Sequence, residues 1–180
     1  GFGSADLGAG RPVTGETLFH LASVSKVFVA TAALQLAERG ALDLDAPIRA
    51  YLPGLSWADL RADAITTRQV LTHRSGIGDV AGDYGWHQPE LDDGALGRFA
   101  AQVADWPLVH DPGTTFAYSN AAFELLGHLI ATLGERTFED HLRTHVLVPA
   151  GMPSSTFLRA EVPGERAAQP HLGLPPRVVP

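Results

Sequence analysis

The chain contains no cysteine, and this absence excludes disulfide bonds, thiol nucleophiles and cysteine-based zinc sites. Charged residues make up only 18% of its 180 residues, and the formal net charge at pH 7 is −7. The arginines occur singly along the chain, so the basic surface that nucleic acids require is not expected. No apolar run approaches the length that spans a bilayer. The composition therefore favours a globular protein that neither binds nucleic acid nor crosses a membrane.

Lysine is almost absent as well, because Lys26 is the only one in the chain. It follows Ser23 by three residues, at the start of a helix predicted from Val24 to Arg39. Residues three apart lie on one helix face, where a lysine amine can take the proton of a serine hydroxyl. Arginine cannot release its proton in a protein, so a proton-accepting role explains the single lysine. The alternative is a serine that caps the helix, followed by a solvated lysine.

One domain with several helices is expected for a chain of this length. The first predicted helix, 24–39, is apolar over most of its surface and is expected to be largely buried. Capping-box patterns open two short helices, one at Thr66 with Gln69 and one at Thr137 with Asp140. The other helical segments are expected near 96–103 and 121–133.

A second candidate group is the triplet Tyr118-Ser119-Asn120, which directly precedes a predicted helix. A tyrosine held near a cation can act as a proton shuttle, and an asparagine offers both a donor and an acceptor to a substrate amide. The alternative is that Ser119 or Asn120 only caps the helix while Tyr118 packs. Taken alone, the triplet favours this alternative, and its functional interpretation depends on the first motif.

Together the two motifs resemble the first two of three motifs in the family of serine β-lactamases and penicillin-binding proteins. The triplet with tyrosine is similar to that of class C β-lactamases, D-Ala-D-Ala carboxypeptidases, D-amino-acid amidases and β-lactamase-like esterases. No Gly-x-Ser-x-Gly pattern occurs, which argues against an α/β-hydrolase. Further segments resemble shared blocks of the family in the family's order: 18–26, 40–53, 66–77, 112–127 and 146–156.

The resemblance implies an α+β fold, the α/β sandwich of the β-lactamase and D,D-peptidase type. It also implies a serine hydrolase that forms an acyl-enzyme without metal or organic cofactor. Ser23 is then the nucleophile, and its backbone N–H is one oxyanion donor. Lys26 and Tyr118 share the acid–base work, while Asn120 helps to hold the substrate and to position Lys26. The implied substrates are small molecules or peptides with amide, ester or β-lactam carbonyls, D-Ala-D-Ala peptides among them.

The third family motif, a Lys or His followed by Thr or Ser and then Gly, does not occur after Asn120. The nearest match, His171-Leu172-Gly173, is interpreted as chance. We therefore expect residues 1–180 to form a partial domain that supplies mainly the helical part and lacks the C-terminal strands of the sheet. This partial domain is expected to need the remaining part, from the same or another chain. Its expected parts are a nucleophile helix (23–39), a substrate-shaping loop region (76–113), a second-motif loop and helix (118–133) and a proline-rich tail (162–180).

Aromatic and histidine residues outside the motifs receive mainly structural interpretations. Tyr84 and Trp86 are candidates for lining the acyl pocket, with packing inside the loop region as the alternative. His73 lies in a shared block and is interpreted as structural, with a functional role as the alternative. His141 and His145 are four residues apart on a predicted helix, but no third ligand is evident, so no metal site is expected.

Two other functions stay open at the level of sequence. A transacylase or peptide cyclase of the same fold would use an amine in place of water to release the acyl group. A catalytically silent module would bind peptidoglycan or penicillin without turnover; the missing third motif favours it, whereas intact Ser23, Lys26 and Tyr118 argue against it. No signal peptide is recognised at the start of the chain, and both an extracytoplasmic and a cytoplasmic bacterial location are compatible with the sequence.

Overall fold

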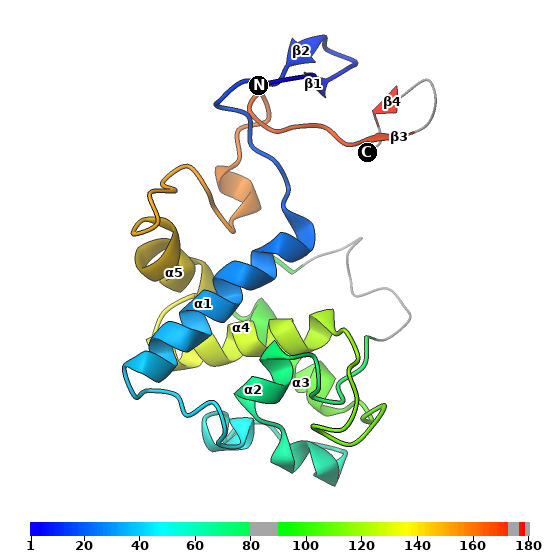
Figure 1. The fold of residues 1–180 in the computed structure, drawn as a ribbon, viewed down its shortest axis with the longest axis vertical. Coiled ribbons are helices and arrows are strands. Elements are labelled where there is room, and N and C mark those ends of the chain that lie inside the picture. The colour runs from blue at the N-terminus through cyan, green and yellow to red at the C-terminus, as the bar shows by residue number, and fades with distance from the viewer. Residues whose placement is uncertain (80–89, 173–176, 179–180) are drawn as a thin grey trace.

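The computed structural model describes residues 1–79, 90–172 and 177–178 of the chain. Figure 1 shows a body of helices with short strands at one end of the molecule. The helix α4 (Asn120–Gly134) lies at the centre of this body. The helices that pack against it are α1 (Ser25–Glu38), α2 (Thr67–Leu71), α3 (Ala95–Ala104) and α5 (Phe138–Leu142).

The buried face of α4 forms the middle of the hydrophobic core. Its N-cap is Ser119, whose side chain accepts a hydrogen bond from the N–H of Ala122. The helix ends at Glu135, which adopts a left-handed conformation with φ 52°. Between these caps most residues are buried, namely Ala121, Ala122, Phe123, Leu125, Leu126, Gly127, Leu129 and Ile130. Because α4 is covered on several sides, the residues at its N-terminal end are held in a fixed place.

Helix α1 is less buried than its composition predicts. Val29, Ala32, Ala33 and Leu36 face the core. In contrast, Val27 is 63% exposed and Leu34 50%. The expectation of a largely buried helix was wrong, because α1 packs against α4, α5 and the segment after α5 on one side only. The other side, which carries Val27 and Leu34, stays exposed in the described part of the chain.

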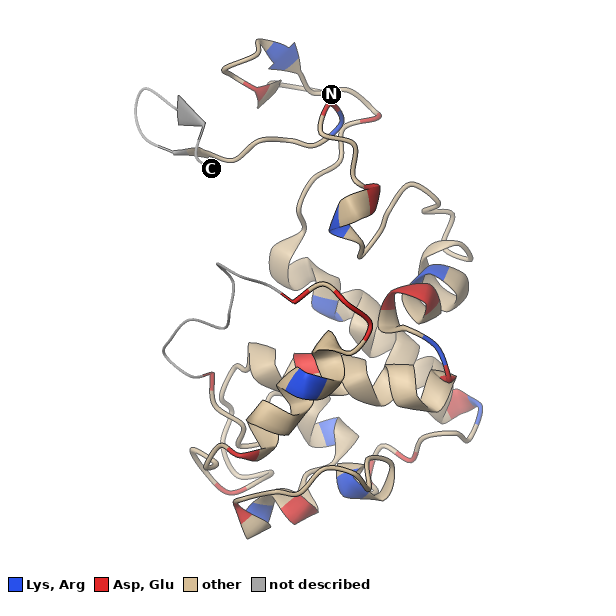
Figure 2. Cartoon of the chain, turned by 180° about the vertical axis from the view of Figure 1, so that it is seen from behind, with Lys and Arg blue, Asp and Glu red and all other residues tan. Residues whose placement is uncertain are grey.

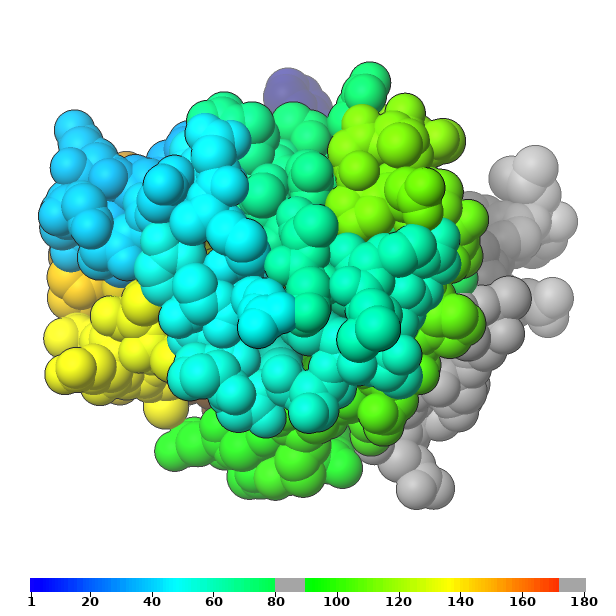
Figure 3. All heavy atoms as spheres, turned by 90° about the horizontal axis from the view of Figure 1, so that it is seen from below, coloured from blue at the N-terminus to red at the C-terminus, as the bar shows by residue number. Residues whose placement is uncertain are grey.

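The segment between α1 and α2 closes one end of the helical body, as the space-filling view in Figure 3 shows. It contains two short 3₁₀ helices, Ile48–Ala50 and Leu60–Ala64, and it inserts Ile48 and Ile65 into the core. The predicted capping box at the start of α2 is confirmed, since the side chains and backbone N–H groups of Thr66 and Gln69 bond reciprocally. At the start of α5 the hydroxyl of Thr137 accepts from the N–H of Asp140. After α5 the chain continues as a π-helical turn, Arg143–Leu147.

The strands are short and lie together at the end of the molecule away from α2 (Figure 1). Strand β1 (Ser4–Asp6) pairs with β2 (Arg11–Pro12), and β3 (His171–Leu172) pairs with β4 (Arg177–Val178), both antiparallel. Segments from the two halves of the sequence meet here, because Leu18 and Ala167 form a parallel bridge. A 3₁₀ helix, Arg159–Glu161, precedes this contact. The expected fold, mainly helical with little sheet, agrees with this arrangement.

Charged side chains lie on the surface, and Figure 2 shows basic segments next to acidic ones. Arg49 pairs with Asp63, and Arg68 donates to both carboxylate oxygens of Asp45 at 2.6 and 2.8 Å. Exposed pairs of this kind contribute at most about 1 kcal/mol each. Among the described residues, no helix has the length and apolar character needed to traverse a bilayer.

His141 is a buried histidine whose charge state couples to folding. Its side chain is 1% exposed, and neither ring nitrogen has a hydrogen-bond partner among the described residues. Burial, followed by the positive charges of His145, Arg39 and Arg136, lowers the pKa of His141 to about 4. In the unfolded chain a histidine titrates near 6.5, so the unfolded state binds the proton more tightly. The contribution to stability is therefore present above pH 6.5 and is lost as the pH falls toward 4.

We predict that the substitution His141→Leu flattens the pH dependence of stability below neutrality. In the unchanged chain, protonation of His141 should lower the free energy of unfolding by at most about 3 kcal/mol between pH 7 and pH 4. This part of the decrease should be missing in His141→Leu, as measured by urea titration across the same pH range. The exposed His20 is a suitable control, and His20→Asn should leave the slope unchanged. A slope in the His141 variant as steep as in the unchanged chain would contradict the assignment.

Candidate active site

Ser23 lies in a short 3₁₀ helix, Ala22–Val24, that leads directly into α1. Its side chain is exposed. The preceding residue, Ala22, has a φ of 45°, a left-handed conformation that non-glycine residues rarely adopt. Such a strained residue is typical of functional turns, where the surrounding structure holds it in place. The turn presents the hydroxyl of Ser23 at the N-terminal end of α1.

The structure brings Ser23, Lys26, Tyr118 and Asn120 into one hydrogen-bonded group. The Oγ of Ser23 lies 2.7 Å from the Oη of Tyr118. The Nζ of Lys26 lies 3.4 Å from the same Oγ, a long contact, and 2.6 Å from the Oδ1 of Asn120. The two predicted motifs therefore meet, although they are 94 residues apart at the Lys26–Asn120 bond.

The ammonium group of Lys26 also faces aromatic rings. Its Nζ lies 4.8 Å from the ring centroid of Tyr118 and 5.5 Å from that of Phe123. Desolvation acts to raise the pKa of Tyr118, but the hydrogen bonds with Lys26 and Ser23 and the charge of Lys26 outweigh it. The net effect is a pKa of Tyr118 below its ordinary value. A lower pKa makes the phenolate more accessible, so this geometry can move a proton to and from Ser23.

The ring of His73 packs against the ring of Tyr118. Its ring centroid lies 4.5 Å from that of Tyr118 and 5.0 Å from that of Phe123. Its Nδ1 accepts from the N–H of Ser119 at 3.2 Å, and its carbonyl oxygen accepts from the N–H of Ala117 at 2.8 Å. Burial, and then the charge of Lys26, lowers the pKa of His73, whereas the charge of Asp79 acts to raise it by less. The sequence interpretation of His73 as structural missed this contact with the candidate site.

Asp79 is a second residue that the sequence did not single out. Its carboxylate accepts from the backbone N–H groups of Asn120 and Ala121 at 2.5 and 3.2 Å, and from the Nδ2 of Asn120 at 2.8 Å. Nothing in the sequence distinguishes Asp79 from other aspartates, because its 41-residue distance from Asn120 is closed only by the fold. Composition does single out its partner, because Asn120 is the only asparagine in the chain, as Lys26 is the only lysine.

The other two predicted site residues, Tyr84 and Trp86, lie outside the described residues. Within the described parts of the chain, no three histidine or acidic residues are arranged to hold a metal ion. A cavity of about 330 Å³ lies elsewhere, between the segment 51–55 and the helices α3 and α4, and it is lined in part by His128.

The loop 73–79 is fixed to the chain around His110. The N–H of Val109 donates to the carbonyl of Gly76 at 2.9 Å, and the N–H of Gly113 donates to the carbonyl of Arg74 at 2.7 Å. Gly76 has a φ of 83°, and a Cβ at this position would clash with the carbonyl oxygen of His110. The loop therefore depends on glycine at 76 for both its conformation and its close approach.

Comparison with known proteins agrees with these features. A family model described as "Beta-lactamase" matches residues 1–180. The chain is 35% identical over 167 residues to penicillin-binding protein 4 of Amycolatopsis lactamdurans, covering 92% of the chain and 43% of that protein. It is 36% identical over 181 residues to the esterase EstB of Burkholderia gladioli, covering 94% and 45%. The octameric penicillin-binding protein homologue from Pyrococcus abyssi superposes with a TM-score of 0.83 at 28% identity, covering 99% of the chain and 42% of that structure.

The expected fold class is confirmed by the structural match. The chain spans less than half the length of the curated relatives it matches.

We predict that Gly76→Ala destabilises the protein by about 2 to 4 kcal/mol, because it adds a clash to an unfavourable φ. Gly151 provides a matched control, since it also has a positive φ, 71°, but no atom lies within 4 Å of an added Cβ. Gly151→Ala should cost only about 1 kcal/mol. Urea denaturation of both variants measures the difference, and equal losses would show that the approach to His110 is not tight.

Proposed function

The chain belongs to the beta-lactamase family, and from this premise we propose that it is the part of a serine hydrolase that becomes acylated on Ser23. The observation that carries the proposal is the 2.7 Å hydrogen bond between Ser23 Oγ and Tyr118 Oη, with Lys26 bonded beside it. A serine hydroxyl becomes a nucleophile only when a neighbouring group takes its proton. Both groups that can do so lie within reach of the same oxygen.

In the proposed reaction, Ser23 Oγ attacks the substrate carbonyl carbon, and its proton passes to Tyr118 or Lys26. The bond to the leaving group then breaks, and the leaving group takes up that proton. Water attacks the acyl-enzyme in the second half of the reaction and releases the acid. The hydroxyl of Ser23 lies closer to Tyr118 Oη than to Lys26 Nζ, which favours Tyr118 as the direct proton acceptor. The charge of Lys26 stabilises the phenolate form of Tyr118. The backbone N–H of Ser23 serves as one oxyanion donor.

The proposed substrates carry an amide, ester or β-lactam carbonyl. The relatives named as a penicillin-binding protein and as an esterase support both amide-type and ester carbonyls. Water or an amine can attack the acyl-enzyme in the second step. A transacylase or peptide cyclase is therefore the alternative of the same mechanism, and the ratio of hydrolysis to aminolysis products in the presence of an added amine distinguishes the two.

We further propose that the remaining part of the domain, from the same or another chain, covers the exposed face of α1. Val27 and Leu34 lie on this face, and the N-cap residue Val24 extends it; all three are at least half exposed. They are apolar residues spaced three and seven apart, which places them along one side of the helix. An apolar stripe of this kind marks an interaction surface. Because the chain spans less than half of its relatives, the remainder of the domain is the natural occupant, and it would also supply the third motif.

The mass of the protein after incubation with a fluorescent penicillin or a fluorophosphonate tests the nucleophile. We expect one adduct, which is lost in Ser23→Ala. Lys26→Arg keeps the charge but cannot accept a proton, so a slowing of labelling by at least about 100-fold assigns proton transfer to Lys26, and a smaller effect leaves Tyr118 as the acceptor. Tyr118→Phe should also slow labelling, whereas Tyr51→Phe should not, because the Tyr51 hydroxyl bonds to Asp43 instead.

An adduct that persists in Ser23→Ala would contradict the assignment. Penicillin that binds without any adduct, in a protein that includes the rest of the domain, would favour the silent binding module instead.

If the rest of the domain covers the exposed face of α1, a substitution on this face should affect stability differently in the 180-residue chain and in a protein that includes the rest of the domain. Leu34→Gln should change the stability of the 180-residue chain by less than about 1 kcal/mol, because Leu34 is half exposed there. In the longer protein the same substitution should cost more than about 2 kcal/mol, since it buries an amide in an apolar contact. Equal and small losses in both proteins, measured by urea denaturation, would show that this face stays in solvent.

A further inference from the structure

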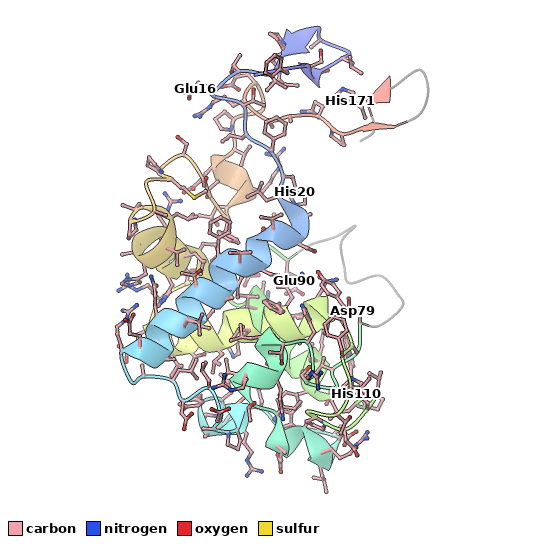
Figure 4. All side chains as sticks on the ribbon, in the orientation of Figure 1. Glu16, His20, Asp79, Glu90, His110 and His171 are labelled. Carbon is pink, nitrogen blue, oxygen red and sulfur yellow. The ribbon has the colours of Figure 1, made fainter. Side chains whose placement is uncertain are left out.

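The side-chain amide of Asn120 bridges two charged groups at the N-terminal end of α4. On one side its Nδ2 donates to the Oδ2 of Asp79 at 2.8 Å. On the other side its Oδ1 accepts from the Nζ of Lys26 at 2.6 Å. Figure 4 labels Asp79 beside this end of α4. The chain's only asparagine therefore lies between its only lysine and a carboxylate from a distant loop.

The chemistry of the two partners allows only one orientation of this amide. A lysine ammonium group can only donate hydrogen bonds, and an ionised carboxylate can only accept them. With the Asn120 oxygen toward Lys26 and its nitrogen toward Asp79, both contacts are satisfied. A 180° rotation of the amide would place two donors against each other on one side and two acceptors on the other. The carboxylate of Asp79 thus favours the orientation in which the nitrogen of the Asn120 amide faces it.

We propose that Asp79 is a positioning residue, which fixes the amide of Asn120 with its oxygen toward Lys26 and thereby holds the Lys26 side chain beside Ser23. The importance of this arrangement for acylation rests on the function proposed above. The geometry supports a role beyond capping the helix. Ser119 already provides the N-cap of α4, and Asp79 contacts the Asn120 side chain in addition to two backbone N–H groups.

The substitution Asp79→Asn separates orientation from folding. Asp79 is exposed, so its replacement by an isosteric amide removes no core contact. The new side chain has one oxygen in place of two, and that oxygen can accept from the backbone of Asn120 and Ala121 or from the Asn120 side chain, but not from both groups. The N-cap from Ser119 is retained. Asp93→Asn is the matched control, because it removes the same charge from an exposed aspartate outside the site.

Lys26 reports its own position without any assay of activity. In every variant of the 180-residue chain it stays the only lysine, so this chain labelled with ¹³C-lysine gives one Cε signal. A side chain held in one place shows two distinct Hε shifts, which merge when the side chain rotates freely. We expect two distinct shifts in the unchanged protein and in Asp93→Asn, and merged shifts in Asp79→Asn. Circular dichroism checks that each variant is folded.

The rate of Ser23 labelling by a fluorophosphonate gives the functional readout. Asp79→Asn should slow labelling by about 10- to 100-fold, as expected when a reacting group loses its fixed position. The double variant Asp79→Asn with Asn120→Asp exchanges the donor and acceptor between the two residues. It again presents an oxygen to Lys26, so it should recover both the distinct Hε shifts and part of the lost rate.

Unchanged Hε shifts of Lys26 in a folded Asp79→Asn protein would overturn the proposal, whatever the labelling rate. Failure of the double variant to restore the shifts would also overturn it. If a protein that includes the rest of the domain takes no label at all, the proposed function fails, while the lysine signal of the 180-residue chain still decides whether Asp79 sets the orientation of Asn120.

Discussion

The candidate site depends on the packing of α1 against α4, because these helices carry its two halves. Lys26 lies in the first turn of α1, Ser23 in the 3₁₀ helix directly before it, and Asn120 is the first residue of α4. The 2.6 Å bond between Lys26 and Asn120 joins the two ends. A buried core fixes the angle between the helices, and close-packed interiors do not deform easily. The distances at the site are therefore set by apolar residues that do not take part in its chemistry.

Electrostatics at the site are arranged around one cation. Lys26 is the positive charge, and burial together with that charge keeps the nearby His73 below its ordinary pKa. A second cation under the Tyr118 ring would compete with Lys26 for the same hydroxyl and for the same aromatic faces. As a neutral ring, His73 can instead accept the Ser119 N–H and pack against Tyr118. The charge of Lys26 thus acts on Tyr118 without a second cation below the ring, and it outweighs the opposing charge of Asp79.

The sequence predicted the elements that depend on local pattern. The family resemblance and the α+β fold are confirmed, and so is the capping box of Thr66 and Gln69. The helix expected near 96–103 is observed as Ala95–Ala104. These features follow from spacing and from side-chain chemistry within a few residues. The roles of Ser23, Lys26 and Tyr118 stay predictions, although the structure brings these residues within hydrogen-bonding distance.

What the sequence could not predict depends on contacts between distant segments. The burial of α1 was overestimated, because composition shows how apolar a helix is but not how many of its sides are covered. Asp79 and His73 were missed as partners of the second motif for the same reason. The loop that contains them reaches residues 117–121 only because Gly76 lets it pass close to His110. A motif identifies the groups that can react, whereas the residues that hold those groups in one orientation become visible only in the folded chain.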